Sequence, residues 1–213
     1  MARPSNTGER RQQIARALLK VMAKKGYDGA SIAAIARAAR VAQGLVHYHF
    51  KDKREILLLA IEELGARHRE RLDARLGAAG GAEARLEAFL VAHLGLEEAD
   101  GEALACWVLV SGEALQEKQV GRAFEEVLRG TGERLKGILE AGVKEGAWVC
   151  EDLDAAVAAL LALIQGYFVL AASARGVIPP GSALATARRV ARGLLGASEA
   201  PPGRARRRVE ARS

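Results

Sequence analysis

Polar side chains that can recognise a polyanion gather in the segment from Gln43 to Lys53. Its amide, imidazole and phenol groups can hydrogen-bond to the edges of nucleic-acid bases, and its lysines can neutralise phosphates. A glutamine pairs well with adenine, and a leucine contacts the methyl group of thymine. Gln43, Leu45 and His47 are therefore the predicted base-reading residues.

The sequence gives little indication of a metal site or a catalytic site. His47 and His49 are two residues apart, so on a helix their side chains point apart, and no cluster of carboxylates or cysteines accompanies them. Cys106 and Cys150 lack the spacing of a zinc module or a disulfide framework, so we expect reduced, mostly buried thiols. No glycine-rich phosphate loop, G-x-S-x-G motif or Cys/His nucleophile pair is present. We therefore expect no enzyme, no metal and no cofactor.

Two short helices joined by a tight turn must position the polar segment. Ser31 can cap the first helix, predicted at Ile32–Ala39, whose apolar residues recur at the spacing of one helix face. The turn is Arg40-Val41-Ala42, and the second helix is predicted to begin near residue 43 and end at 49 or 50. Such a pair makes a helix-turn-helix, which places its second helix in the major groove of DNA. An ordinary helical hairpin is the alternative.

The residues of this region resemble a known family. The pattern I-A-x-x-A-x-V-x-x-G-x-x-x-Y-H-F-x-x-K, ending at Lys53, resembles the N-terminal domain of the TetR family of bacterial transcriptional repressors. Within it, Gln43–Phe50 is similar to the BetI-like variant, and the resemblance covers about residues 9 to 60. It implies phosphate contacts from Lys53, Tyr48 and Ser31. The full set of expected DNA-contacting residues is Ser31, Arg40, Gln43, Leu45, His47, Tyr48, His49, Lys51 and Lys53.

Two positions depart from the family pattern. Gly is usual where this chain has Arg40, and Ser or Thr is frequent where it has Ala42. A Gly would relieve backbone strain in the turn, so Arg40 must adopt the same conformation or the turn must differ. Ala42 removes a capping hydroxyl, which leaves Gln43 or solvent to satisfy the first N–H groups of the second helix.

Charge is distributed unevenly along the 213 residues, whose net charge is +6. Residues 1–54 hold twelve basic and three acidic residues, residues 55–196 hold fifteen and twenty-one, and residues 197–213 hold five and two. A generally basic composition does not explain why the excess is localised. The pattern predicts a polyanion partner for the N-terminal part alone.

The remaining sequence predicts an all-α protein, because apolar residues recur at helical spacing and β-branched alternation is absent. We expect a three-helix helix-turn-helix domain at residues 1–53, a helical ligand-binding and dimerisation domain at 54–196, and a disordered basic tail at 197–213. About nine helices are predicted, at Glu9–Lys25, Ile32–Ala39, 43–49, Arg54–Leu76, Glu83–Leu96, Glu102–Gln116, Gln119–Gly146, Asp152–Arg175 and Ser182–Leu195.

The segment from Ala155 to Ala174 contains no charged residue and is long enough to span a membrane. Its high alanine content and the presence of Gln165 and Gly166 favour a buried core or a subunit interface instead. We expect the last two long helices to pair with those of a second copy as a four-helix bundle. The expected location is the cytoplasm, because the polar N-terminus shows no signal peptide.

The resemblance implies a dimeric repressor that a small-molecule inducer releases from a palindromic double-stranded DNA operator. The ligand-binding candidates are Phe89, Trp107, Phe124, Tyr167, Phe168 and the polar Gln165, with Trp148 as a further aromatic residue. Aromatic rings suit a cationic ammonium ligand, and the BetI-like resemblance suggests choline. A DNA-binding protein without a ligand is the main alternative, and a helical enzyme is the weaker one.

Overall fold

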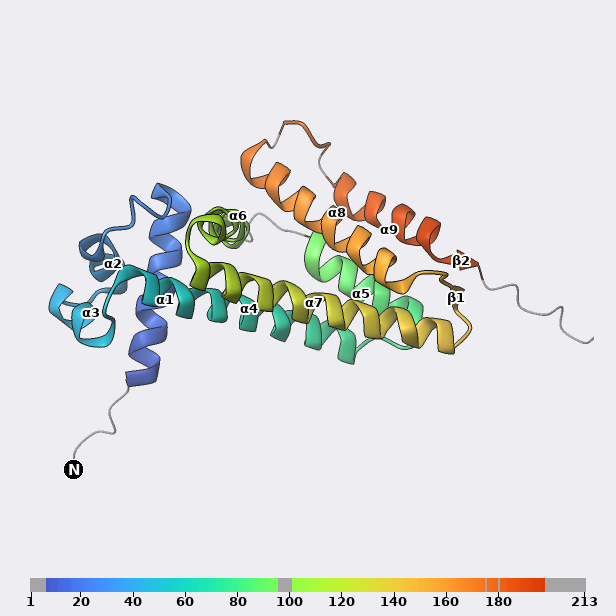
Figure 1. The fold of residues 1–213 in the computed structure, drawn as a ribbon, viewed down its shortest axis with the longest axis horizontal. Coiled ribbons are helices and arrows are strands. Elements are labelled where there is room, and N and C mark those ends of the chain that lie inside the picture. Colours follow the sequence, from blue (N-terminus) through green and yellow to red (C-terminus); the bar gives the residue numbers. More distant parts are fainter. Residues whose placement is uncertain (1–6, 96–100, 175, 180, 198–213) are drawn as a thin grey trace, which may run out of the picture.

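The computed structural model describes residues 7–95, 101–174, 176–179 and 181–197, and these residues form an all-α fold (Figure 1). The predicted fold class is confirmed. The predicted tail lies, apart from residue 197, outside the described residues. The described helices are α1 Thr7–Lys25, α2 Ile32–Ala39, α3 Gln43–His49, α4 Lys53–Gly77, α5 Ala82–Leu94, α6 Gly101–Gln116, α7 Lys118–Lys144, α8 Leu153–Ser173 and α9 Ser182–Leu194.

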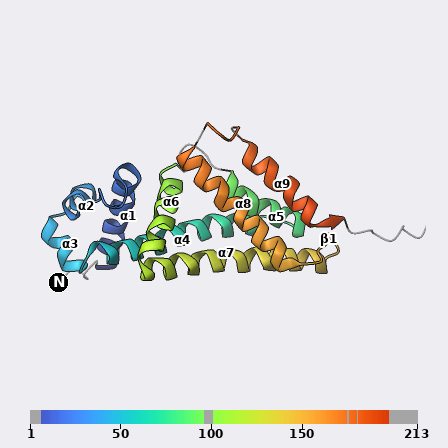
Figure 2. The same ribbon diagram turned by 45° about the horizontal axis from the view of Figure 1, so that its top comes forward.

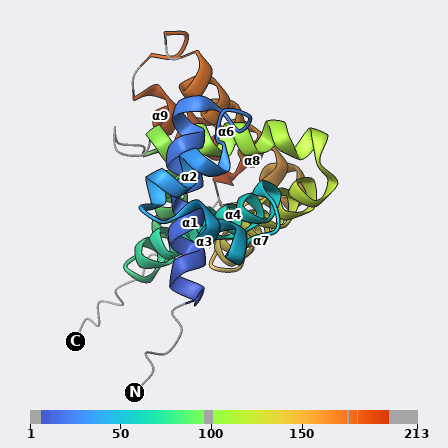
Figure 3. The ribbon, with the colours of Figure 1, turned by 90° about the vertical axis from the view of Figure 1, so that its left-hand side faces the viewer.

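Helices α1, α2 and α3 form a small unit at one end of the molecule (Figures 1 and 3). Helix α1 packs against α2, α3 and the first part of α4. The core of this unit is apolar and closely packed, with Ile14, Leu18, Ile35, Val46 and Phe50 all nearly inaccessible to solvent. Because every helix contributes to one core, α3 is held in place by side chains distant in sequence.

The long helix α4 connects this unit to the rest of the protein, and the long helix α7 packs against α4 (Figure 1). They lie side by side and run in the same direction, since ion pairs join Arg54 to Glu117 near their starts and Asp73 to Arg134 further along. Helix α6 crosses near the start of α4 and packs against α1, α7 and α8. Helix α6 therefore contacts both the N-terminal unit and the body.

Helices α8 and α9 lie together on one side of the body (Figures 1 and 2). A buried stripe of α8, spaced at every fourth residue, faces the core through Ala156, Leu160, Ile164 and Phe168. Within the described part of the chain, α8 is the one helix long and apolar enough to cross a membrane, and only 22% of its most apolar window is buried. Its inner face belongs to the helical core, and its outer face is apolar but uncovered in a single copy.

A short antiparallel strand pair closes the far end of the body. Strand β1 (Trp148–Val149) pairs with β2 (Gly196–Ala197) in the register Trp148 with Ala197. The indole of Trp148 is buried and donates a 3.0 Å hydrogen bond from Nε1 to the carbonyl of Leu139. Its ring lies against Gly142 of α7, where a Cβ atom would be 1.9 Å from the ring. The absence of a side chain at Gly142 is thus what admits the indole.

Candidate nucleic-acid interface and ligand cavity

The turn between α2 and α3 takes the conformation that the family pattern reserves for glycine. Arg40 has φ +56° and ψ +44°, and its N–H donates to the carbonyls of Ala36 and Arg37. The N–H of Val41 donates to the carbonyl of Ala36 at 3.0 Å, which completes the end of α2. The departure at Arg40 therefore leaves the turn intact and places a strained, exposed arginine beside α3.

Helix α3 has one buried face and one exposed face. Val46 faces the core, together with Phe50 just after the helix, while Gln43, His47 and Tyr48 are exposed. The phenol ring of Tyr48 is 80% exposed, an unusual position for a large aromatic side chain. Leu45 and His49 are half-buried at the boundary. Gln43, His47 and Tyr48 are therefore the predicted DNA-facing residues of α3 that lie fully on its outward surface, and Ala42 supplies no side-chain cap at the start of α3.

Side chains of α1 hold α3 in its orientation. The guanidinium of Arg11 donates to the carbonyl of His49, pairs with Glu55 at 2.9 Å and lies 4.2 Å above the ring of Phe50. The amide of Gln13 donates a 2.6 Å hydrogen bond to the carbonyl of Ala39 at the end of α2. The sequence showed Arg11 and Gln13 only as polar positions of an amphipathic helix. Nothing in local spacing indicated their partners.

The residues predicted to contact phosphate differ in exposure and in the contacts they already make within the protein. The hydroxyl of Ser31 caps α2 by accepting from the N–H of Ala34 at 3.2 Å, which confirms the predicted cap. Lys51 is exposed. Lys53 instead turns back towards Tyr27. Its ammonium donates to the carbonyl of Tyr27 at 2.8 Å and lies 4.0 Å from the centre of the Tyr27 ring. Lys53 would have to share or release these contacts to reach a phosphate.

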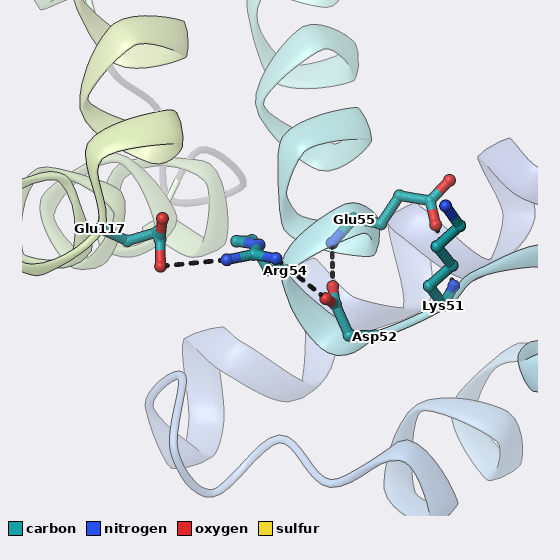
Figure 4. A network of polar contacts seen from close by, with 5 residues as sticks. All are labelled: Lys51, Asp52, Arg54, Glu55 and Glu117. Atoms are coloured by element: carbon teal, nitrogen blue, oxygen red, sulfur yellow. Dashed lines mark hydrogen bonds and ion pairs between the residues drawn. The ribbon is translucent and has the colours of Figure 1, made fainter.

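A polar network ties the start of α4 to the body (Figure 4). Asp52 caps α4 by accepting from the N–H of Glu55 at 2.8 Å. Arg54 reaches Asp52 at 3.2 Å and Glu117 at 3.3 Å, and Glu117 is the residue that precedes α7. Exposed pairs of this kind contribute little stability. Their importance is that the junction of α6 and α7 contacts the residues next to α3.

The predicted ligand residues separate into two groups. Trp107, Gln165 and Phe168 line a cavity of about 50 Å³ between α4, α5, α6, α7 and α8. Phe89, Phe124 and Tyr167 lie outside its wall: Phe89 is fully buried, and the rings of Phe124 and Trp107 are 5.8 Å apart. The cavity is lined by His68, Arg71, Ala92, His93, Ala103, Leu104, Trp107, Val127, Leu128, Thr131, Gln165 and Phe168.

A pair of histidines in this wall was missing from the sequence-based candidates. His68 Nε2 and His93 Nε2 are 2.8 Å apart, and His93 Nδ1 is 2.8 Å from the carbonyl oxygen of Phe89. A carbonyl oxygen only accepts, so neutral His93 carries its proton on Nδ1 and accepts on Nε2 from His68. Burial lowers the pKa of His68 to about 3 and that of His93 to about 4. Both rings are thus neutral at pH 7, and no metal-binding cluster of three or more ligating residues occurs in the described chain.

Comparison with protein families matches both parts of the chain. Residues 14–60 match the model described as bacterial regulatory proteins, tetR family, and residues 82–196 match the model described as BetI-type transcriptional repressor, C-terminal. The second match spans more than half of the chain and includes α5 to α9, where the sequence alone showed only helical periodicity.

Individual proteins and structures agree with these matches. The chain is 30% identical over 167 residues to the HTH-type transcriptional regulator BetI of Serratia proteamaculans, covering 76% of this chain and 81% of that protein. It is 29% identical over 147 residues to the fatty acid metabolism regulator protein of Bacillus subtilis, covering 68% and 74%. A regulator from Saccharomonospora viridis, solved in complex with choline, has a TM-score of 0.81 at 20% identity, covering 89% of this chain and 99% of that one.

Proposed function

The chain belongs to the TetR family of bacterial regulatory proteins, and we propose that it is a dimeric repressor which a small molecule releases from DNA. Its family makes it a DNA-binding transcriptional regulator and not an enzyme. The observation that carries the proposal is the exposed polar face of α3 within a basic N-terminal unit. We assign DNA binding to residues 1–53 and regulation to residues 54–196, in a cytoplasmic protein that meets its DNA there.

The exposed side chains of α3 are assigned distinct roles. Gln43 and His47 lie on the outward face, where a helix in the major groove presents its side chains to base edges. Tyr48 and Lys51 lie at the end of α3, where they would meet phosphates. Base contacts determine sequence preference, whereas phosphate contacts raise affinity for every sequence.

Selection of bound fragments from random DNA tests this assignment. We expect a palindromic site, with Gln43→Ala changing the preferred base at one symmetric position of each half-site. We expect Lys51→Ala to weaken all sites alike and to reduce the salt dependence of binding by about one released cation per protomer. Lys25→Ala, in the last turn of α1, is the matched control. An asymmetric site, or equal effects of Gln43→Ala and Lys51→Ala on preference, would contradict the assignment.

The outer face of α8 supports a dimer in which α8 and α9 of one copy pack against α8 and α9 of a second copy. Ala158, Ala162, Gly166 and Leu170 are exposed and follow one another at every fourth residue, so they form one ridge of small and apolar side chains. A ridge of this spacing fits the groove of a second helix, and small residues allow the two backbones to approach. Two such helix pairs related by a two-fold axis make a four-helix bundle.

Mass measurement in solution tests the dimer. Ala162→Glu places a charge in the proposed interface and should give a monomer at micromolar concentration, while the unchanged protein is a dimer. Ala74→Glu, at an exposed position of α4, is the control and should remain dimeric. A monomeric unchanged protein, or a dimeric Ala162→Glu variant, would refute this interface.

The similar proteins point to different classes of ligand. The choline complex of one structural neighbour suggests a cation, whereas the name of the Bacillus subtilis relative suggests fatty acid chemistry. The cavity of about 50 Å³ is much smaller than the roughly 300–1,000 Å³ of most ligand sites, which favours ligand-independent DNA binding as the second candidate. Thermal stabilisation by a small molecule would distinguish the two, and the charge of the surrounding residues indicates which molecule to use.

A further inference from the structure

A cleft of about 640 Å³ lies between the N-terminal unit and the body. Its wall is formed by α1, the end of α2, α4 and α6. Positive charge predominates in it: the basic lining residues are Arg16, Lys20, Arg40, Arg67 and Arg71, against the acidic Glu70 and Glu102. Of these, Arg16 also pairs with Glu63 at 3.6 Å. A cleft lined mainly by one sign of charge concentrates ions of the opposite sign.

The cleft adjoins the inner cavity. His68, Arg71, Ala103 and Trp107 line both spaces, so they form the boundary between them. Beyond this boundary the wall is largely apolar, with Leu104 and Phe168 among its members, and its described lining includes no carboxylate. The neutral imidazoles of the buried His93 and the half-buried His68, with the carboxamide of Gln165, add polarity without charge. The outer cleft is thus cationic, and the adjoining inner cavity is largely apolar.

We infer that the regulatory ligand is an amphiphilic anion, with its charged head group in the basic cleft and its apolar chain directed into the inner cavity. This inference rests on the proposed function as a ligand-responsive regulator. A quaternary ammonium head group would meet several guanidinium and ammonium groups in the cleft. A carboxylate head group would meet opposite charges there, and Arg67 can donate two parallel hydrogen bonds to it.

The position of the cleft supplies a route to DNA. A head group in it contacts α1 and the end of α2 directly, since both contribute to the wall. An apolar chain needs more space than the present 50 Å³, so it binds best to a state in which the helices around the cavity, α6 among them, have moved apart. Helix α6 leads into Glu117, which pairs with Arg54 next to α3. The ligand would therefore favour a different placement of the N-terminal unit.

Three ligands with the same chain and different head groups test the inference: octanoate, octyltrimethylammonium and 1-octanol. Isothermal titration with the full-length protein without DNA should show octanoate binding at least tenfold more tightly than octyltrimethylammonium, with 1-octanol between them. Tighter binding of the cation, or binding of none of the three, would overturn the inference. Operator binding measured without ligand reports on the proposed function separately, because it needs no ligand.

Charge-neutral variants locate the head group. Lys20→Gln and Arg67→Gln should each weaken octanoate binding about twofold to fivefold, the range expected of an exposed ion pair. Lys24→Gln and Arg75→Gln remove the same charges from α1 and α4 outside the cleft lining and should leave octanoate binding unchanged. Equal losses in cleft variants and controls would place the anion elsewhere. Thermal denaturation of each variant verifies that it is folded.

Discussion

Replacing Arg40 separates backbone strain from charge at the turn before α3. Arg40 is the one residue other than glycine with positive φ in the described chain, at +56°. A left-handed conformation costs an L-residue about 1–2 kcal/mol, whereas glycine adopts it without that cost. Glycine loses about 0.5–1 kcal/mol more backbone entropy on folding, so Arg40→Gly should stabilise the protein by about 0.5–1 kcal/mol. Arg40→Ala keeps the Cβ atom and the strain.

Urea unfolding at one fixed protomer concentration measures this difference. We expect Arg40→Gly to raise the free energy of unfolding, and Arg40→Ala to leave it within about 0.5 kcal/mol of the unchanged protein, because the side chain is exposed. Equal stabilities of the Gly and Ala variants would refute the strain argument. A stabilised Ala variant would refute it as well, since alanine retains the side-chain clash.

Operator binding by the same two variants measures the charge. Both variants remove one positive charge beside α3, so both should weaken operator binding by the same factor. Each should also lower the slope of log affinity against log salt by about 0.9 per phosphate contact of each protomer. A larger loss for one variant would show that the turn conformation, and not the charge of Arg40, governs DNA binding.

Two further predictions concern the body. Gly142→Ala should destabilise the protein by about 1–3 kcal/mol, because a Cβ atom would lie 1.9 Å from the Trp148 ring. Gly137→Ala, in the same helix with no atom within 4 Å, should instead stabilise it by up to about 1 kcal/mol, and urea unfolding that shows equal signs would contradict the packing argument. Lowering the pH from 7 to 5 should reduce the unfolding free energy by about 2 kcal/mol for each of His68 and His93. Their pKa values near 3 and 4 keep them neutral when folded, while unfolded histidines with a pKa near 6.5 take up protons. Constant stability across this range would contradict the neutral pair.

Local signals were sufficient to predict the helix-turn-helix from the sequence. The cap at Ser31 and the apolar spacing of α2 predicted its bounds, and the turn residues separated it from α3. The uneven charge predicted which end meets DNA. These features depend on neighbours within one or two helical turns, so they can be predicted without knowledge of the tertiary structure.

Helix ends in the body were predicted less accurately. The helix predicted at Asp152–Arg175 is observed as Leu153–Ser173, and the one predicted at Glu83–Leu96 ends at Leu94. The helix predicted at Gln119–Gly146 is observed as α7, Lys118–Lys144, and it contains Gly130 and Gly132 without a break. Packing against neighbouring helices stabilises α7 across positions that are unfavourable in an isolated helix.

The amino-acid sequence by itself determined an all-α chain, its DNA-binding segment and the outward face of α3, because short-range periodicity and capping encode them. Only the tertiary structure decided that Lys53 turns towards Tyr27, that His68 meets His93, and that Trp107 lines a cavity while Phe124 does not. An apolar stripe shows that a residue faces inward, but not what it faces. That depends on contacts between helices distant in sequence, which exist only after the chain has folded.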